Sequence, residues 1–166
     1  PEGADIVPRL GLMPGDYEVA TVHRAENTDD DGQLAKVIDF LKARPGQVVL
    51  PLHPRTRAAL ARAGLTLDGI TVTDPLGDLE MTHLVKDSSG VLTDSGGLQK
   101  EAYFHRVPCI TLRDETEWVE TVDAGWNRLW QAPETDAPRR EITDYGDGNA
   151  AGRIAQAAAA YLDEGS

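Results

Sequence analysis

Residues 91–102 read VLTDSGGLQKEA, and the stretch changes character in the middle. Its apolar start is typical of the end of a buried strand, and its second half is typical of a helix. The join, Asp-Ser-Gly-Gly, has no side-chain bulk at Gly96 and Gly97. Such a turn lets a ligand approach free backbone N–H groups at a helix start, where the dipole favours a phosphate or diphosphate. A tight turn capped by Ser95 explains the residues equally well.

The alternation of strand and helix patterns continues along most of the chain. We expect strands at residues 17–22, 47–52, 70–73, 90–93, 109–112 and 127–130. We expect helices at about residues 29–43, 54–63, 78–86, 96–105, 115–124 and 150–162. The strands are continuous apolar runs, which indicates a parallel sheet whose two faces are both covered by helices. The sequence therefore predicts an α/β fold, in a single domain over residues 1–166.

Polar clusters follow five of the predicted strands. They lie at residues 23–27, 53–55, 74–76, 94–97 and 113–115, and the last of them contains Arg113. Parallel strands all end at the same edge of the sheet, and ligands of such folds bind beyond that edge. We therefore expect these clusters to converge on one ligand site.

Several side chains in and near these clusters suit a phosphorylated ligand. His23 can donate to a phosphate or exchange a proton near neutral pH, and the adjacent Arg24 adds charge that favours a functional role. His53 precedes a proline, and capping of a helix is as plausible there as ligand binding. Glu101 lies where a carboxylate can accept hydrogen bonds from a ribose diol. Trp118 is a candidate wall of a sugar pocket.

Composition narrows the function further. The chain has 166 residues, and 16 Lys and Arg against 28 Asp and Glu leave a formal net charge of −12. This charge opposes binding to nucleic acid or to an anionic membrane, and no apolar run is long enough to span a bilayer. With one cysteine, Cys109, neither an intrachain disulfide nor a thiolate zinc site can form, which is typical of the cytoplasm. No spacing of His, Asp and Glu suggests a metal site. The start at Pro1 suggests that an upstream piece is missing.

Four motifs in this order resemble the C-terminal half of the non-hydrolysing UDP-N-acetylglucosamine 2-epimerases. They are TVHRAEN (21–27), LPLHPRT (50–56), TDSGGLQKEA (93–102) and VPCITLRDETEW (107–118), and the resemblance runs from about Val7 to Leu162. It implies a Rossmann-like domain, the C-terminal half of a glycosyltransferase-B-type two-domain architecture with the nucleotide sugar in the cleft. It also implies that the N-terminal domain is absent from this chain.

The resemblance assigns a role to most of the candidate residues. Ser95, Gly96 and Gly97 would hold the diphosphate, Glu101 the ribose hydroxyls and Met81 the uracil, while His23 would be catalytic and support departure of UDP. Arg24 and His53 match positions near a second, regulatory site of some bacterial members, and Arg113 and Trp118 are also expected to bind substrate. Trp118-Val119 stands where many members have Arg-Pro. This variant is similar to members that act on 2,3-diacetamido uronic acid nucleotides.

The family chemistry is reversible inversion at C2 of the sugar, by elimination of UDP to a glycal and its re-addition. The resemblance implies no cofactor, places the proton-transferring carboxylates in the absent domain, and favours a homodimer of the full-length protein. We therefore expect an isomerase domain that is inactive by itself. Two alternatives stay open: a non-catalytic module that binds nucleotide sugars for regulation, and a glycosyltransferase of the same architecture.

Overall fold

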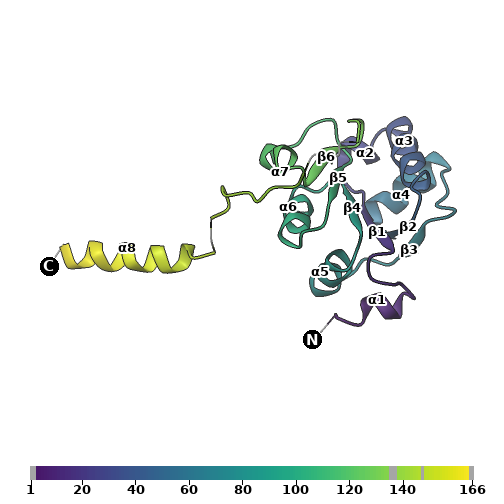
Figure 1. The fold of residues 1–166 in the computed structure, drawn as a ribbon. Coiled ribbons are helices and arrows are strands. Elements are labelled where there is room, and N and C mark those ends of the chain that lie inside the picture. Colours follow the sequence, from purple (N-terminus) through teal and green to yellow (C-terminus); the bar gives the residue numbers. More distant parts are fainter. Residues whose placement is uncertain (1–2, 135–137, 147, 165–166) are drawn as a thin grey trace.

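The computed structural model describes residues 3–134, 138–146 and 148–164. Its strands are β1 (Tyr17–Thr21), β2 (Gln47–Pro51), β3 (Thr71–Thr73), β4 (Gly90–Thr93), β5 (Cys109–Thr111) and β6 (Asn127–Leu129). Its helices are α1 (Ile6–Arg9), α2 (Ala25–Thr28), α3 (Asp31–Lys42), α4 (Pro54–Ala63), α5 (Asp78–Lys86), α6 (Gly96–Phe104), α7 (Val119–Asp123) and α8 (Ala150–Glu164). Strands and helices alternate as predicted (Figure 1).

The strands form one parallel sheet in the order β3-β2-β1-β4-β5-β6. The chain first builds outward from β1 through β2 to β3. It then crosses back, places β4 on the other side of β1, and continues outward through β5 to β6. Thr21 at the end of β1 is in register with Thr93 at the end of β4. The order therefore reverses between β1 and β4, and their carboxyl ends lie side by side.

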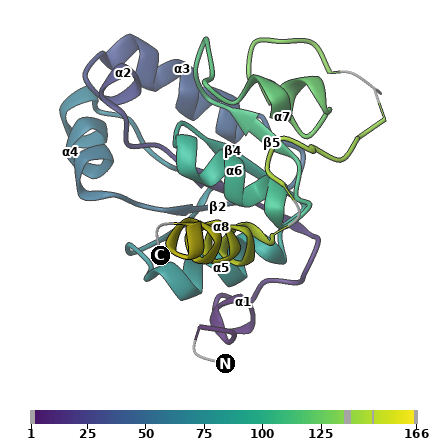
Figure 2. The same cartoon turned by 90° about the vertical axis from the view of Figure 1, so that its left-hand side faces the viewer.

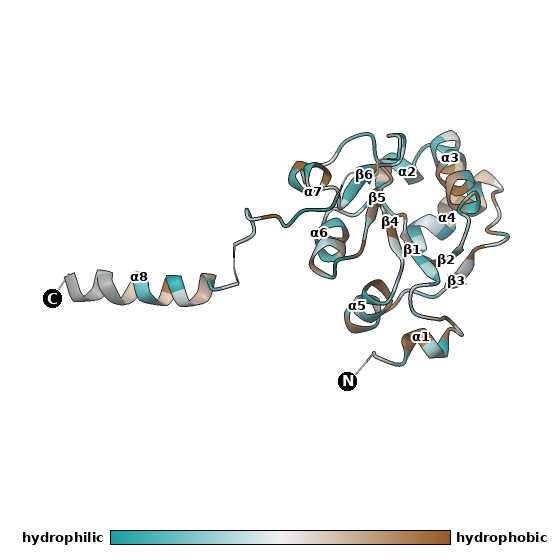
Figure 3. Cartoon of the chain, in the orientation of Figure 1, coloured by the Kyte–Doolittle hydropathy of each residue, from teal (hydrophilic) through white to brown (hydrophobic). Residues whose placement is uncertain are grey.

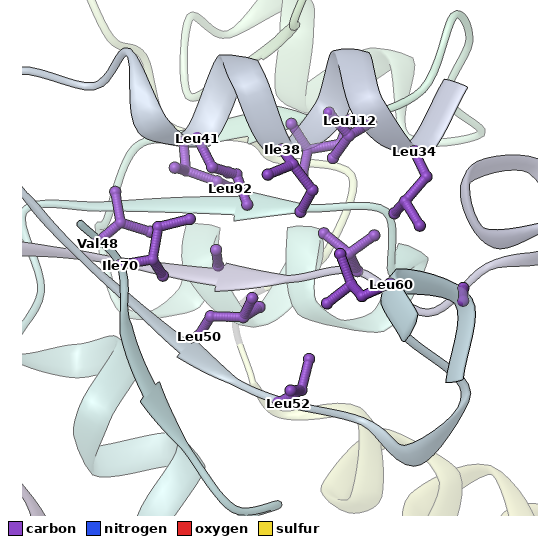
Figure 4. Close-up of a cluster of buried hydrophobic side chains, with 14 of the residues drawn as sticks. Leu34, Ile38, Leu41, Val48, Leu50, Leu52, Leu60, Ile70, Leu92 and Leu112 are labelled. Atoms are coloured by element: carbon purple, nitrogen blue, oxygen red, sulfur yellow. The ribbon is translucent and has the colours of Figure 1, made fainter. Parts of the chain in front are cut away.

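Both faces of this sheet are covered, as the sequence predicts. Successive strand residues point to opposite faces, so Ala20 and Leu92 belong to one buried cluster and Val19 and Val91 to another. The first cluster contains residues of α3 and α4, and the second contains residues of α1, α5 and α6. In Figure 4, Leu34, Ile38 and Leu41 of α3 point toward the sheet, where Leu92 of β4 and Leu112, the residue after β5, lie. Hydropathy follows the same division, with apolar residues on the inner sides of the helices (Figure 3).

Side-chain caps mark the starts of three helices, α3, α4 and α6. Asp30 accepts a hydrogen bond from the N–H of Gln33 and begins α3, and His53 does the same for Arg55 at the start of α4. Ser95 accepts from the N–H of Leu98 and begins α6. These caps satisfy N–H groups that have no partner within the helix, and so they define where these three helices begin.

Two local predictions were wrong. The helix predicted for residues 115–124 is only α7, and residues 114–118 form an irregular loop. The hydroxyl of Thr116 donates to Oε1 of Gln99 on α6 and accepts from the N–H of Trp118. These contacts with a distant helix hold the loop against local helix propensity. Two short helices, α1 and α2, were not predicted at all, and α2 begins directly after Arg24.

The last helix lies apart from the rest of the chain. Figures 1 and 2 show α8 projecting away from the sheet, whereas α1 at the other terminus lies beside α5. Ile154, an apolar residue of α8, is 69% exposed. Within the described part of the chain, no helix is both long enough and apolar enough to cross a membrane.

Candidate functional site

A cavity of about 320 Å³ lies at the point where the strand order reverses. Ligands of open α/β sheets bind in this crevice, outside the carboxyl ends of the strands. Six of the predicted site residues line it: His23, His53, Met81, Ser95, Gly97 and Glu101. They come from the loops and helices after four different strands, so the predicted convergence of the polar clusters is observed for those four. Arg24, Gly96, Arg113 and Trp118 do not line it.

The loop after β1 is organised around a buried carboxylate. Asp94 is fully buried, and its Oδ2 accepts from the N–H of His23 at 3.0 Å and from the N–H of Arg24 at 2.9 Å. The amide of Asn27 also donates to this oxygen, at 3.1 Å, and to the carbonyl of Leu112 at 2.9 Å. Asp94 thus ties the end of β4 to the turn that carries His23. Sequence reasoning placed Asp94 in a polar cluster and assigned it no role.

The two glycines of the opening stretch face different surroundings. A Cβ atom on Gly97 would have only Ser95 Oγ nearby, at 3.9 Å, and Gly97 lines the cavity. A Cβ atom on Gly96 would overlap Oε1 of Glu117 and lie 3.2 Å from Nε1 of Trp118. Gly97 therefore leaves the helix start open to the cavity, whereas Gly96 makes room for the chain's own side chains. Ser95 acts as the cap of α6, which confirms the capping explanation of the turn, and the approach of a ligand to this helix start stays a prediction.

Charged side chains form a network on the Gly96 side of α6. Arg113, only 8% exposed in its side chain, pairs with Glu117 at 2.8 Å and with Glu26 at 3.4 Å, and Arg24 lies 3.9 Å from Glu117. The pKa of Glu117 is lowered by its own backbone N–H, and then by Arg113 and Arg24. Sequence reasoning missed Glu117, which only the tertiary pairing identifies. Direct contact of Arg24 and Arg113 with substrate stays a prediction.

Trp118 lies on the same side of α6. Its Nε1 is buried and has no hydrogen-bond partner within the described part of the chain, and the ammonium of Lys100 lies 4.2 Å from the centroid of its ring. The ring is therefore next to the start of α6, outside the cavity described above. Its contact with a sugar is untested.

The ring nitrogens of the two histidines at the cavity have different partners within the chain. Nδ1 of His53 accepts from the N–H of Arg55 at 3.2 Å, which confirms the capping role considered for it. Nδ1 of His23 instead lies 3.6 Å from Oδ1 of Asp94. The two ring centroids are 5.7 Å apart, and both residues line the cavity. Two groups that can donate to an anion thus stand beside the open N-terminus of α6.

Residues of α5 and α6 form another part of the cavity wall. Met81 on α5 is partly buried and contacts the apolar cluster of that sheet face, while Glu101 on α6 is exposed and lines the same cavity. An apolar side chain and a carboxylate thus line the same cavity. Among the residues that the structure describes, no group of three or more His, Cys, Asp or Glu could hold a metal ion.

This sheet order, with a cavity at the reversal point, is that of the doubly wound, Rossmann-like α/β proteins that bind nucleotides. The family model described as UDP-N-acetylglucosamine 2-epimerase matches residues 4–159. The chain belongs to this family.

Curated relatives and solved structures agree with the assignment. The chain is 46% identical over 162 residues to a UDP-2,3-diacetamido-2,3-dideoxy-D-glucuronate 2-epimerase of Pseudomonas aeruginosa, covering 89% of this chain and 46% of the relative. A UDP-N-acetylglucosamine 2-epimerase of Methanocaldococcus jannaschii is 39% identical over 127 residues, covering 71% of this chain and 35% of the relative. The chain thus spans less than half the length of these curated relatives.

A solved structure of the Methanocaldococcus jannaschii UDP-GlcNAc 2-epimerase superposes with a TM-score of 0.80 at 30% identity, covering 95% of this chain and 50% of that one. A second structure of this enzyme, in complex with UDP-GlcNAc and UDP, gives a TM-score of 0.75 at 30% identity and covers 93% and 48%. The fold predicted from the sequence, the Rossmann-like part of a glycosyltransferase-B-type architecture, is confirmed.

Proposed function

We propose that this chain is the UDP-sugar-binding domain of a sugar-nucleotide 2-epimerase, an isomerase that inverts C2 by elimination and re-addition of UDP. The observation that carries the proposal is the cavity at the reversal of the strand order. It brings the open N-terminus of α6 at Gly97 together with His23, Glu101 and Met81. Supporting it, the family model matches residues 4–159 and a solved relative binds UDP-GlcNAc and UDP.

Each part of the cavity suits one part of UDP. The N–H groups at Gly97 and the dipole of α6 favour the diphosphate, and Ser95 lies beside them. Glu101 accepts hydrogen bonds from the ribose hydroxyls, and Met81 packs against the uracil. Lys and Arg do not line the cavity, so the diphosphate charge is balanced by the helix start and by the histidines.

In the reaction, the bond between C1 of the sugar and the diphosphate oxygen breaks, and its electron pair goes to that oxygen. His23 stabilises the negative charge that develops there. The proton on C2 leaves to a base, and a proton returns to the opposite face before UDP adds back. We assign that acid–base pair to a domain outside this chain, as the resemblance of the sequence implies.

One observation adds a 2,3-diacetamido uronate as a second candidate for the sugar part of the substrate. Residues 118–119 are Trp-Val, where many family members have Arg-Pro, and a relative at 46% identity is a 2,3-diacetamido-glucuronate epimerase. UDP-N-acetylglucosamine is the family substrate, and the diacetamido uronate is the second candidate. Incubating the full-length protein with each UDP-sugar and following deuterium uptake from solvent at C2 separates them.

The same experiment distinguishes the other classes of function. A regulatory binding module would bind UDP-sugar without exchange at C2, and a glycosyltransferase would consume it only with an acceptor. The N-terminal domain, a homodimer of the full-length protein and a cytoplasmic location remain predictions from the sequence.

The binding proposal is tested on the 166-residue chain itself. UDP is titrated while backbone amide shifts are recorded, and Gly97 and Ser95 are expected to shift, with weak affinity because the cavity is open on one side. An amide shift of Gly97 that stays unchanged in a large excess of UDP would refute the proposal. The chain alone is expected to give no deuterium uptake at C2, because inversion needs positioned acid–base groups and exclusion of water from the glycal.

A further inference from the structure

The buried carboxylate of Asp94 and the ring of His23 have a relationship that the proposed reaction does not yet use. Asp94 directly follows β4, and His23 follows the adjacent strand β1, so the two meet at the reversal of the strand order. Oδ1 of Asp94 lies 3.6 Å from Nδ1 of His23. This separation is that of an ion pair and slightly too long for a hydrogen bond.

The two oxygens of Asp94 are occupied unequally. Oδ2 accepts three N–H donors at 2.9–3.1 Å, from His23, Arg24 and Asn27. Among the residues that the structure describes, Oδ1 receives only the N–H of His23, at 3.3 Å. A carboxylate oxygen in a fully buried residue requires donors, and Nδ1 of His23 is the further nitrogen that an observed contact brings to it.

We propose that Asp94 is a positioning residue for His23: its carboxylate holds the ring with Nδ1–H toward Oδ1 and leaves Nε2 to meet the ligand. The tautomer follows from the partners, because a carboxylate accepts hydrogen bonds and cannot donate one to Nδ1. The backbone N–H groups of His23 and Arg24 bond to the same carboxylate, so ring and backbone are fixed together. The ligand in this statement rests on the proposed function.

His53 provides the opposite case within the same cavity. Its Nδ1 accepts from the N–H of Arg55, so a neutral His53 carries its proton on Nε2. Two histidines with ring centroids 5.7 Å apart are thus expected to be opposite tautomers. The consequence for His23 is chemical: a neutral ring presents Nε2 as an acceptor, and it donates to a diphosphate oxygen only when protonated.

The tautomers are measured directly on the 166-residue chain, from the ¹⁵N shifts of the imidazole nitrogens at a pH where both rings are neutral. His23 is expected to be protonated at Nδ1 and His53 at Nε2. A neutral His23 that carries its proton on Nε2 overturns the proposal, and no variant is needed for this result.

Asp94→Asn then tests the cause. The amide can keep its oxygen toward the three N–H donors and turn its NH₂ toward Nδ1, which must then accept. His23 should switch to the Nε2–H form while His53 stays unchanged as an internal control. In enzymes where a buried aspartate orients a histidine, this exchange keeps the geometry and selects the wrong tautomer. A folded Asp94→Asn chain in which His23 keeps Nδ1–H would show that Asp94 does not set the tautomer.

In the full-length protein, Asp94→Asn removes the negative partner of a protonated His23, the form that donates to the diphosphate. Turnover is therefore expected to fall by about a hundredfold, the scale of a positioned proton-donating group, and KM to change much less. Unchanged turnover overturns the proposal. A UDP titration on the unmodified chain separates the two levels of inference. If the amide shift of Gly97 does not change when UDP is added, the proposed function fails, and the tautomer result is unaffected. If UDP binds and His23 is in the Nε2–H form, only the role of Asp94 fails.

Discussion

Glu117 occupies the space in which a side chain on Gly96 would lie. Its Oε1 would overlap a Cβ atom there, and Trp118 Nε1 would lie 3.2 Å from the same atom. The adjacent Gly97 has open space, with Ser95 Oγ at 3.9 Å as the nearest neighbour. Two consecutive glycines thus differ: Gly96 makes room for packing, and Gly97 leaves the helix start open to the cavity, so single substitutions can test the two positions separately.

Gly96→Ala is expected to destabilise the fold, because the new methyl group must push Glu117 away from Arg113, with which it pairs at 2.8 Å. Overpacking of this kind costs about 1–3 kcal/mol, and the lower part of that range applies because a flexible carboxylate moves. The free energy of unfolding, from urea denaturation, measures the effect. A variant as stable as the unmodified chain would show that Glu117 relocates without loss.

Gly97→Ala should leave the free energy of unfolding unchanged or slightly raised, because the site has room and alanine restricts the unfolded chain. UDP affinity should fall, because the methyl group lies between the cavity and the N–H groups of α6. Isothermal titration with UDP provides the measurement. Equal UDP affinity for Gly97→Ala and the unmodified chain would place the diphosphate elsewhere.

Glu101→Ala is expected to weaken UDP binding by about 1.5–3 kcal/mol, the range for hydrogen bonds to a charged group. Glu101 is exposed and lines the cavity, so its removal should leave the fold intact. The control is 2′,3′-dideoxy-UDP, which lacks the hydroxyls that Glu101 would bind. If both ligands lose the same affinity, Glu101 does not bind the ribose.

Glu117 should contribute to the pH dependence of stability. Its pKa is lowered in the folded chain by its own backbone N–H and by Arg113 and Arg24. A lowered pKa gives stability that is present above the unfolded pKa of Glu, about 4.3, and lost as pH falls through the folded value. Glu117→Gln should therefore reduce the loss of stability on acidification below about pH 5.

The effect of Glu117→Gln should be small, because the side chain is 44% exposed and solvent screens the pairs. Urea denaturation at neutral and acidic pH measures it. Glu115→Gln, a change at an exposed position in the same loop, is the matched control. Identical pH profiles for the Glu117→Gln and Glu115→Gln variants would mean that the network around Arg113 adds no stability.

Cys109 is expected to be unreactive toward iodoacetamide in the folded chain. It is buried on β5, and burial raises the pKa of its thiol to about 12. The reactive thiolate is therefore scarce at pH 8, and the reagent cannot reach it. Mass spectrometry should find no adduct in buffer and complete labelling in denaturant. Rapid labelling of the folded chain would indicate that β5 opens.

The course of the main chain could be predicted largely from local patterns. Apolar runs with β-branched residues determine the strands. Asp30 and Ser95 mark helix starts through hydrogen bonds to nearby backbone N–H groups, and Pro54 marks one through its fixed φ, so none of them needs a distant partner. The parallel arrangement followed from strand–helix alternation. Because parallel strands end on one edge, the location of the site followed as well.

Tertiary structure decided which side chains at that edge contact other parts of the chain and which line the cavity. Gly96 and Gly97 are adjacent glycines that look alike in the sequence. Only the position of the loop that carries Glu117 makes Gly96 a packing site. The same holds for residues 114–118, where Thr116 bonds to Gln99 and prevents a predicted helix. Asp94 and His23 are distant in sequence, and their pairing exists only because β4 lies beside β1. Sequence patterns encode backbone preferences, which are local, whereas the partner of a charged side chain depends on which strands become neighbours.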